Sequence, residues 1–328
     1  MFNQMERNVL INNGFLQFNL VARGLILTGL KYETRSMKLV VITLIAFLTV
    51  LGQPSKEAND EWESLLDSEL TNWENYLSYR HKPGYNGKIP KDANGVDIEP
   101  IGYNKDETGV FTILDEPEGP VLRVSGEIYG SIFTKKSYKN YHLKLQVKWG
   151  TAKYEPRKDL LKDSGILYHS IGEAGVEYWR SWMLSQEFQV MEGHMGDFWC
   201  QATSGIDIRS FPAEGDKMSP VADSTQPFRP FQGGGDVFCL RSSNFETPDN
   251  GWTTLELITF EGKSLHIVNG QVAMVLENSR YKNGNGEQVP LIEGKIQLQS
   301  EAAEVFYKDI QIKTITELPK NYEVLFEN

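Results

Sequence analysis

Apolar and polar residues alternate along several short segments of this chain. The clearest segment runs from Tyr141 to Trp149, where Tyr, Leu, Leu, Val and Trp take every second position and His, Lys, Gln and Lys stand between them. A period of two is that of a strand with one buried face. Related segments at 110–124, 253–275 and 294–312 are separated by turn residues, among them Asn269-Gly270, which is typical of a tight hairpin. The pattern predicts an all-β antiparallel sandwich with long loops and little helix.

The N-terminal residues do not follow this pattern. Residues 1–36 mix Asn-rich and apolar pieces without a helical or strand period, so we interpret them as a non-domain extension ahead of a true start at Met37. The apolar run Leu39 to Leu51 then ends at the small residue Gly52. Such a run is typical of a secretory signal and is shorter than the ~20 residues that span a bilayer. We therefore expect an exported protein, periplasmic, cell-surface or secreted, with no stable membrane span in the mature chain.

Polar and charged residues follow the apolar run, and strand patterns begin further on. A sandwich of roughly 200–250 residues often forms a single domain. The predicted organisation is an extension at 1–36, a signal peptide at 37–52, a linker at 53–60, one β-sandwich domain at 61–317 and a C-terminal tail at 318–328.

The charge balance excludes two classes of partner. The formal net charge is -11, and the chain has no block rich in Lys or Arg. Nucleic acids and anionic membrane surfaces both need a basic patch, so neither is expected as a partner. A neutral ligand such as a carbohydrate fits better. Cys200 and Cys239 lie in no metal-binding pattern, and the sequence leaves open whether they form a disulfide.

The candidate site centres on the segment Gln186 to Glu192. Read as a strand, it places Phe188 and Val190 on one face and Glu187 and Gln189 on the other. A Gly-punctuated loop with a histidine, a carboxylate and a tryptophan follows directly, so charge, hydrogen bonding and a stacking surface come together as a sugar site requires. The alternative is that the polar face of this strand only meets water.

Two other segments attract attention. Gly165, near the start of a predicted strand at 163–169, suggests a backbone that another group approaches closely, or else a simple bulge. Residues 200–236 are rich in Gly and Pro and are predicted to form a long irregular stretch, which is usually functional or flexible.

The order of these pieces resembles a known family, the bacterial 3-keto-disaccharide hydrolase domain. The matching motifs, which cover about residues 60–315, are Gly130 to Thr134, Tyr141 to Trp149, Asp163 to Ile166, Glu187 to Val190, Gly251 to Glu256, Val268 to Gly270, Gly294 to Gln299 and Val305 to Ile310. The resemblance implies a jelly-roll sandwich of the concanavalin-like lectin/glucanase type and a 3-keto-glycoside substrate. Asp163 and Thr253 depart from the family pattern, where Asn is common, so a contact made by either amide would be altered.

A glycoside oxidised at C3 is open to elimination, because the ketone acidifies the C2 proton. This route needs a base, an acid for the leaving oxygen, and a donor or metal for the enolate. We assign Glu187 as the base and His169 as a second acid/base or a metal ligand. Substrate-binding candidates are Gln189 and Asp163 for hydrogen bonding, Lys148 for the enolate and Trp199 for stacking. Any cofactor is unidentified, although Glu192, His194 and Asp197 could together bind a divalent cation.

Two classes of function compete at this point. The first is an exported hydrolase that cleaves 3-keto-glycosides or related oligosaccharides. The second is a lectin-like module that binds glycan without cleaving it. The polar strand and the 200–236 stretch favour the enzyme, because a purely structural protein would not need a carboxylate and an amide at this place.

Overall fold

The computed structural model describes residues 11–12, 15–16, 21–22, 25–26, 61–214, 219–233, 235 and 237–327. The chain divides into two compact units, Met1–Glu57 and Ala58–Asn328. In the first, four two-residue strands form two antiparallel pairs: β1 (Ile11–Asn12) with β2 (Phe15–Leu16), and β3 (Val21–Ala22) with β4 (Leu25–Ile26). The predicted signal peptide at 37–52 and linker at 53–60 lie outside the described residues.

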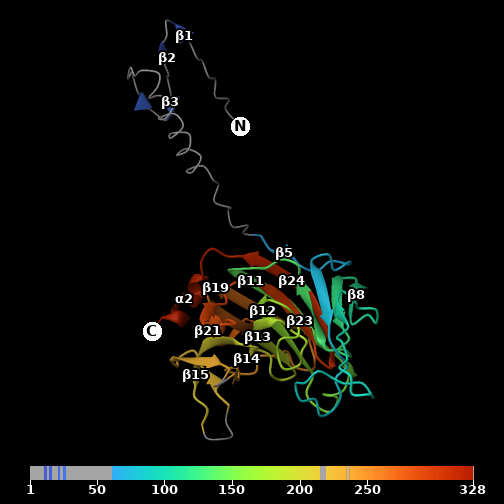
Figure 1. Cartoon of the computed structure of the whole chain (residues 1–328). Coiled ribbons are helices and arrows are strands. Elements are labelled where there is room, and N and C mark those ends of the chain that lie inside the picture. The colour runs from blue at the N-terminus through green and yellow to red at the C-terminus, as the bar shows by residue number, and fades with distance from the viewer. Residues whose placement is uncertain are drawn as a thin grey trace. The chain divides into compact units, whose positions relative to one another are not determined.

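The second unit is a sandwich of two antiparallel sheets, as the alternation predicted (Figure 1). The eight-stranded sheet has the order β18 (Phe238–Cys239), β14 (Phe198–Gln201), β13 (Leu184–Met191), β12 (Asp163–Ile171), β23 (Lys295–Ser300), β10 (Gly130–Thr134), β6 (Trp73–Leu77) and β7 (Gly102–Tyr103).

The twelve-stranded sheet forms the other layer. Its main order is β16 (Val221–Ala222), β15 (Ser204–Phe211), β21 (Gln271–Lys282), β20 (Lys263–Val268), β19 (Thr253–Phe260), β11 (Tyr141–Lys153), β24 (Ala303–Thr314), β9 (Gly119–Val124) and β8 (Phe111–Glu116). Three further strands pair at its margins: β17 (Phe228–Gln232) with β15, β22 (Gln288–Pro290) with β21, and β5 (Glu63–Ser64) with β24.

The main core lies between the two sheets. Strand β11 buries its alternate residues from Tyr141 to Trp149 there, as predicted, and strand β13 adds Phe188 and Val190. These side chains are almost wholly removed from water, and burial of each large apolar side chain contributes roughly 1.5–3 kcal/mol. The opposite face of β13, with Glu187 and Gln189, therefore points away from the core.

Two parts of the predicted organisation need correction or extension. Residues 200–236 are not one irregular stretch, because β15, β16 and β17 lie within them. β16 has only two residues and β17 contains Pro230, so local alternation did not reveal them, whereas β15 has eight residues and its alternating Ile206 and Ile208 could have marked it as a strand. Residues 318–328, predicted as a tail, contain a helical turn, α2 (Lys320–Glu323), and a 3-10 turn, η2 (Val324–Phe326). Leu318 and Phe326 pack in a cluster with residues of β19, β20 and β21, and Figure 1 shows α2 beside these strands.

No helix in the described part of the chain combines the length and the apolar character that a bilayer span requires.

Candidate active site

A cleft of about 660 Å³ lies over the outer face of the eight-stranded sheet. Its floor comes from β12, β13, β23 and the residue Glu301 just after β23, and its walls come from β14 and from the loop at 177–182 between β12 and β13. Glu187, Gln189, Asp163, Trp199 and His194 all line this one cleft. The structure thus brings together five of the residues that the sequence proposed for the site.

The strand register explains this convergence. On β13, Glu187 lies opposite Leu167 of β12, Gln189 lies opposite Gly165, and Met191 lies opposite Asp163. Because side chains two residues apart on a strand share a face, these residues form a grid on the outer face of the sheet.

Gly165 stands near the middle of the grid and leaves a hollow there. A Cβ atom at this position would lie 2.4 Å from Gln299 Oε1 and 2.6 Å from Glu187 Oε1, closer than real Cβ contacts come. The prediction that another group closely approaches this backbone is confirmed. The absence of a side chain at Gly165 allows the ends of Glu187 and Gln299 to fold over the sheet toward each other.

Four carboxyl groups gather in and around this hollow, on Asp163, Glu177, Glu187 and Glu301. All four are buried, and the exposed fraction of Glu187 is only 2%. Arg157 is the one arginine or lysine among the described lining residues, and its Nη2 atom lies 2.6 Å from Asp163 Oδ2. One cation therefore faces four buried acids, and most of these acids form no ion pair with it.

The pKa values of these four carboxyl groups are raised, so each group binds its proton more tightly than an exposed acid does. Burial raises the pKa of Glu187 to about 8, although a hydrogen bond donated by Gln201 Nε2 to Glu187 Oε2 opposes this shift. Burial also raises the pKa of Glu177 to about 7, and that of Asp163 to about 7 despite the opposing effect of Arg157. Burial, and then the neighbouring Asp163, also raise the pKa of Glu301 well above its ordinary value. Near neutral pH the cleft therefore contains both protonated and ionised carboxyl groups, which is what proton transfer requires.

Glu177 organises the loop that forms one wall. Its carboxyl group accepts hydrogen bonds from the backbone N–H groups of Trp179, Ser181 and Trp182. The ring of Trp179 stacks on Tyr85 at a centroid distance of 5.1 Å, so the excursion near residue 85 supports the wall from behind.

Aromatic rings occur at both rims of the cleft. Trp199 on β14 lies opposite Glu187 in the strand register and is 36% exposed, with its ring centroid 4.5 Å from that of Phe238. Tyr178 is exposed at the other wall. Exposed aromatic faces beside buried polar groups are the surfaces on which sugar rings stack.

Several buried polar atoms in the cleft have no hydrogen-bond partner among the described residues. They include Asp163 Oδ1, Gln189 Oε1 and Arg157 Nε. Buried polar groups in native proteins are almost always paired, so unpaired atoms that line a cleft indicate a polar ligand or bound water. Two of these atoms are acceptors and one is a donor, so a group that pairs with all three must offer both donors and acceptors.

The possible metal site is not assembled. His194 Nδ1 lies 3.0 Å from Asp197 Oδ2, but Glu192 instead forms an ion pair with Lys162 at 3.5 Å. Within the described part of the chain, no group of three or more His, Cys, Asp or Glu side chains is arranged to bind a metal ion. Cys200 and Cys239 are not joined by a disulfide.

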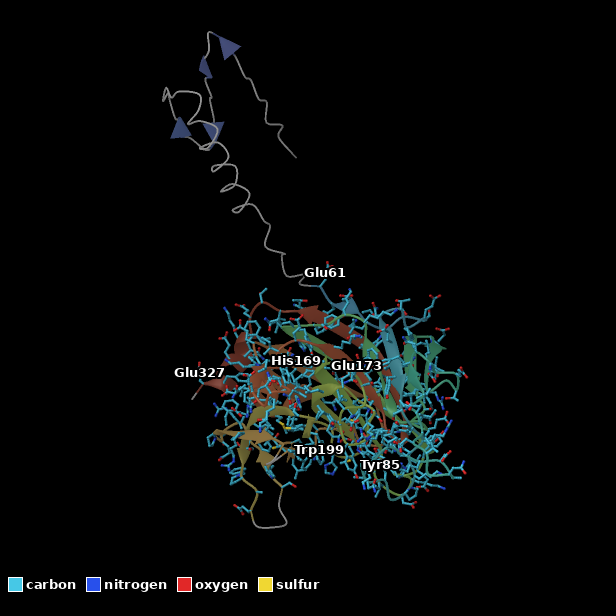
Figure 2. All side chains as sticks on the ribbon, viewed as in Figure 1. Glu61, Tyr85, His169, Glu173, Trp199 and Glu327 are labelled. Carbon is cyan, nitrogen blue, oxygen red and sulfur yellow. The ribbon has the colours of Figure 1, made fainter. Side chains whose placement is uncertain are left out.

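His169 does not reach the cleft, contrary to the interpretation that paired it with Glu187. Its ring is buried near the inward-facing rings of Tyr168 and Tyr141, with centroid distances of 5.2 and 6.1 Å, and burial lowers its pKa to about 3. A β-bulge between Tyr168 and Ile171 and a φ of 53° at His169 interrupt the alternation that would have turned it outward. Figure 2 shows His169 well apart from Trp199.

Lys148 is also remote from Glu187. It lies on β11 of the twelve-stranded sheet, where its neighbours Val147 and Trp149 face the core, and it lines a separate groove with Trp252 and Lys308. Alternation correctly gave an outward direction for Lys148. It could not indicate that this outward face belongs to the opposite side of the sandwich.

Sequence reasoning missed four important members of the cleft. Arg157 and Glu177 come from loops without a regular period, so no local signal marked them. Gln299 and Glu301 continue the polar alternation of the last predicted strand of the eight-stranded sheet, and that signal could have placed them on the same face as Glu187.

The fold and this cleft define a class, a β-sandwich domain with an acidic, aromatic-rimmed cleft on one outer sheet face. The profile of the 3-keto-alpha-glucoside-1,2-lyase-like domain matches residues 61–313. The chain belongs to this family, and the resemblance noted from the sequence is confirmed. Its function is therefore related to carbohydrates.

Comparison with other proteins adds distant likenesses. No curated protein matches this sequence. A candidate glycosyl hydrolase from Parabacteroides distasonis is 16% identical, with 78% of this chain and 100% of that chain covered and a TM-score of 0.41. A second one from the same organism is 15% identical, with 77% and 94% covered and a TM-score of 0.38. The carbohydrate-binding module CBM66 from Bacillus subtilis is 13% identical, with 62% and 92% covered and a TM-score of 0.35.

Proposed function

We propose that this protein is an exported enzyme that cleaves 3-keto-glycosides by elimination across C1 and C2 of the oxidised sugar. The observation that carries the proposal is the buried carboxyl group of Glu187, whose pKa is raised to about 8 by burial at the floor of an aromatic-rimmed cleft. Membership of the 3-keto-alpha-glucoside-1,2-lyase-like family supports the substrate class.

The reaction needs two proton transfers. A base removes the C2 proton, the C2–H electron pair forms the C1=C2 double bond, and the C1–O bond breaks as the leaving oxygen accepts a proton from an acid. The products are an unsaturated 3-keto sugar and an alcohol. If water then adds to C1 and a proton returns to C2, the net result is hydrolysis.

Glu187 is suited to the acid step. The sequence alone suggested that it acts as a base, but a carboxyl group with a pKa of about 8 still carries its proton at pH 7. A carboxylic acid kept neutral by burial can donate that proton to a leaving oxygen, and general acid catalysis of this kind contributes about 10²–10⁴-fold. The hydrogen bond from Gln201 Nε2 to Glu187 Oε2 fixes one oxygen and so orients the other.

The remaining cleft residues would bind the sugar. We assign Trp199 to stacking, and the unpaired oxygen atoms of Gln189 and Asp163 to accepting hydrogen bonds from hydroxyl groups. Arg157 replaces Lys148 in our proposal as the cation beside a developing enolate oxygen, because Arg157 lines the cleft and Lys148 does not. Export is inferred from the apolar run in residues 37–52.

The direct test is to incubate purified protein with synthetic 3-keto-glucosides and with their unoxidised parents. Cleavage of the oxidised substrates alone is expected. The Glu187→Gln variant should lose about 10² or more of turnover on an alkyl 3-keto-glucoside but much less on a 4-nitrophenyl 3-keto-glucoside, whose leaving group needs no proton. If the unmutated protein binds glycan and cleaves no 3-keto-glucoside, the lectin-like alternative replaces the enzyme.

A further inference from the structure

His194 lines the same cleft as Glu187 but comes from a different element, the tight loop between β13 and β14. The loop follows the edge of β13, because Gln189 and the loop exchange backbone hydrogen bonds: Gln189 N–H donates to Asp197 O and Gly196 N–H donates to Gln189 O, each at 3.0 Å. Gln189 is two strand residues, about 7 Å, from Glu187. His194 thus lines the cleft from the loop beyond the end of β13, whereas Glu187 lines it from the strand itself.

A fully buried carboxylate holds the imidazole ring. His194 Nδ1 lies 3.0 Å from Asp197 Oδ2, and Asp197 has no exposed surface. Asp197 is itself fixed by Arg241, whose backbone N–H and Nη1 donate to Oδ1 at 2.8 and 3.1 Å. The arrangement satisfies both oxygens of Asp197, which a buried carboxylate requires.

Hydrogen bonds with charged side chains also hold the rest of the loop. Arg241 Nη2 donates to Gly193 O, and the Glu246 carboxylate accepts hydrogen bonds from Gly193 N at 3.0 Å and from Met195 N at 2.9 Å. A short loop with charged contacts on both sides of His194 holds the ring in one place. Such support is what a proton-transferring side chain needs, and a solvated surface histidine does not require it.

The proposed role requires one tautomer of the ring. Nδ1 lies 3.0 Å from Asp197 Oδ2 and 3.1 Å from Arg241 Nη1, and in the tautomer with a proton on Nδ1 the ring donates to Asp197 while Arg241 Nη1 donates to Oδ1 of the same carboxylate. Nε2 then carries the lone pair and has no hydrogen-bond partner among the described residues. A neutral imidazole oriented by a buried aspartate is an established form of general base.

The other acids of the cleft are already engaged. Asp163 is paired with Arg157 at 2.6 Å, and Glu177 accepts three backbone hydrogen bonds. Glu301, beside Asp163, keeps its proton because it is buried in the same cluster. These contacts leave His194 as the lining group with a free basic nitrogen on a fixed ring.

We propose that His194 is the base that removes the C2 proton of the 3-keto sugar, and that Asp197 is its positioning residue. This inference rests on the proposed elimination. Nε2 takes the C2 proton, the C2–H electron pair forms the C1=C2 bond, the C1–O bond breaks, and the leaving oxygen takes the proton of Glu187. In the hydration step, the imidazolium returns its proton to C2 and Glu187 regains one from the attacking water, so both groups are restored.

The test follows the C2 hydrogen and the leaving group separately. Methyl and 4-nitrophenyl 3-keto-glucosides deuterated at C2 are incubated with the unmutated protein and with His194→Asn, Glu187→Gln and His142→Asn. His142 is a matched control, because it forms a histidine–carboxylate pair with Glu256 at 2.8 Å on the other sheet, away from the cleft. Deuterium loss from C2 and release of each alcohol are measured for every variant.

If His194 is the base, His194→Asn should lower deuterium loss and release of both alcohols by about 10² or more. Glu187→Gln should retain most of the deuterium loss and selectively slow methanol release, and His142→Asn should behave as the unmutated protein. Added imidazole should partly restore a His194→Ala variant, which distinguishes a lost base from a misfolded loop. The conservative Asp197→Asn variant should lose deuterium from C2 more slowly than the unmutated protein but faster than His194→Asn.

Other outcomes would overturn the inference. If His194→Asn keeps deuterium loss within threefold of the unmutated protein while cleavage continues, His194 is not the base, although the proposed function stands. If a chelator abolishes cleavage by the unmutated protein and a divalent cation restores it but imidazole does not rescue His194→Ala, His194 is a ligand and not a base. If the unmutated protein cleaves no 3-keto-glucoside, the proposed function fails and this inference fails with it.

Discussion

The raised pKa of Glu187 makes a prediction about stability that needs no substrate. In an unfolded chain this carboxyl group ionises near its ordinary value of 4.5, whereas in the folded protein burial raises its pKa to about 8. Between these values the folded state binds a proton that the unfolded state has released. The contribution of this group to the free energy of unfolding is therefore fully present below pH ~4.5 and is lost as the pH rises toward 8.

The size of the effect follows from the two pKa values. Each tenfold difference in proton affinity corresponds to about 1.4 kcal/mol. At pH 8 the burial of Glu187 therefore costs on the order of 4 kcal/mol of unfolding free energy relative to a group that does not ionise. Glu187→Gln removes the ionisation and keeps the shape, and its amide oxygen can still accept the hydrogen bond from Gln201.

The assay is urea unfolding followed by tryptophan fluorescence at pH 5 and pH 8. Glu187→Gln should be close to the unmutated protein at pH 5 and more stable at pH 8 by on the order of 4 kcal/mol. Because the charge of Glu187 also raises the pKa of Glu301, its removal eases the ionisation of that neighbour as well. Glu116→Gln is the matched control, because Glu116 is an exposed strand glutamate and its replacement should change stability by less than ~0.5 kcal/mol at either pH. An equal stability of Glu187→Gln and the unmutated protein at pH 8 would refute the reasoning.

Three further predictions concern the hollow, its rim and the N-terminus. Gly165→Ala should fold, because the atoms in its way are the movable ends of Glu187 and Gln299, but turnover on a 3-keto-glucoside should fall about tenfold or more; unchanged turnover would show that the hollow is not used. Trp199→Ala should raise the Michaelis constant about tenfold with a smaller effect on kcat, as expected for lost stacking, and steady-state kinetics would reveal the opposite pattern if the ring acted in the chemical step. N-terminal sequencing of exported protein should begin just after Gly52, and detection of residues 1–36 on that protein would contradict the assigned start.

Strand periodicity accounts for what could be predicted about the cleft. It placed Glu187 and Gln189 on the face opposite Phe188 and Val190, because the direction of successive side chains is a local property of an extended chain. A glycine inside a predicted strand separately indicated either a close approach or a bulge at Gly165, and the structure shows the close approach. The family resemblance then supplied the sandwich that brings these strands together, and the matched profile confirms it.

The remaining features depend on contacts that local sequence does not encode. His169 turns inward at a bulge, and the direction of Lys148 depends on which sheet contains its strand. Arg157 and Glu177 reach the cleft from loops whose course is set by tertiary packing. Periodicity thus predicts the face of a strand well, but it does not predict which faces meet or where a strand is interrupted.

The two proposed proton-transfer groups, Glu187 and His194, lie in different environments, one buried and one partly exposed. Glu187 keeps its proton because burial among other acids makes its ionisation costly, so its readiness as an acid comes at the expense of stability above neutral pH. His194 is partly exposed, and its orientation comes from Asp197 and Arg241, so the loop can be rigid without burying the ring. The acid therefore lies in the floor of the cleft, and the proposed base lies at its wall. This difference in environment allows the two groups to act together on adjacent carbons of one sugar.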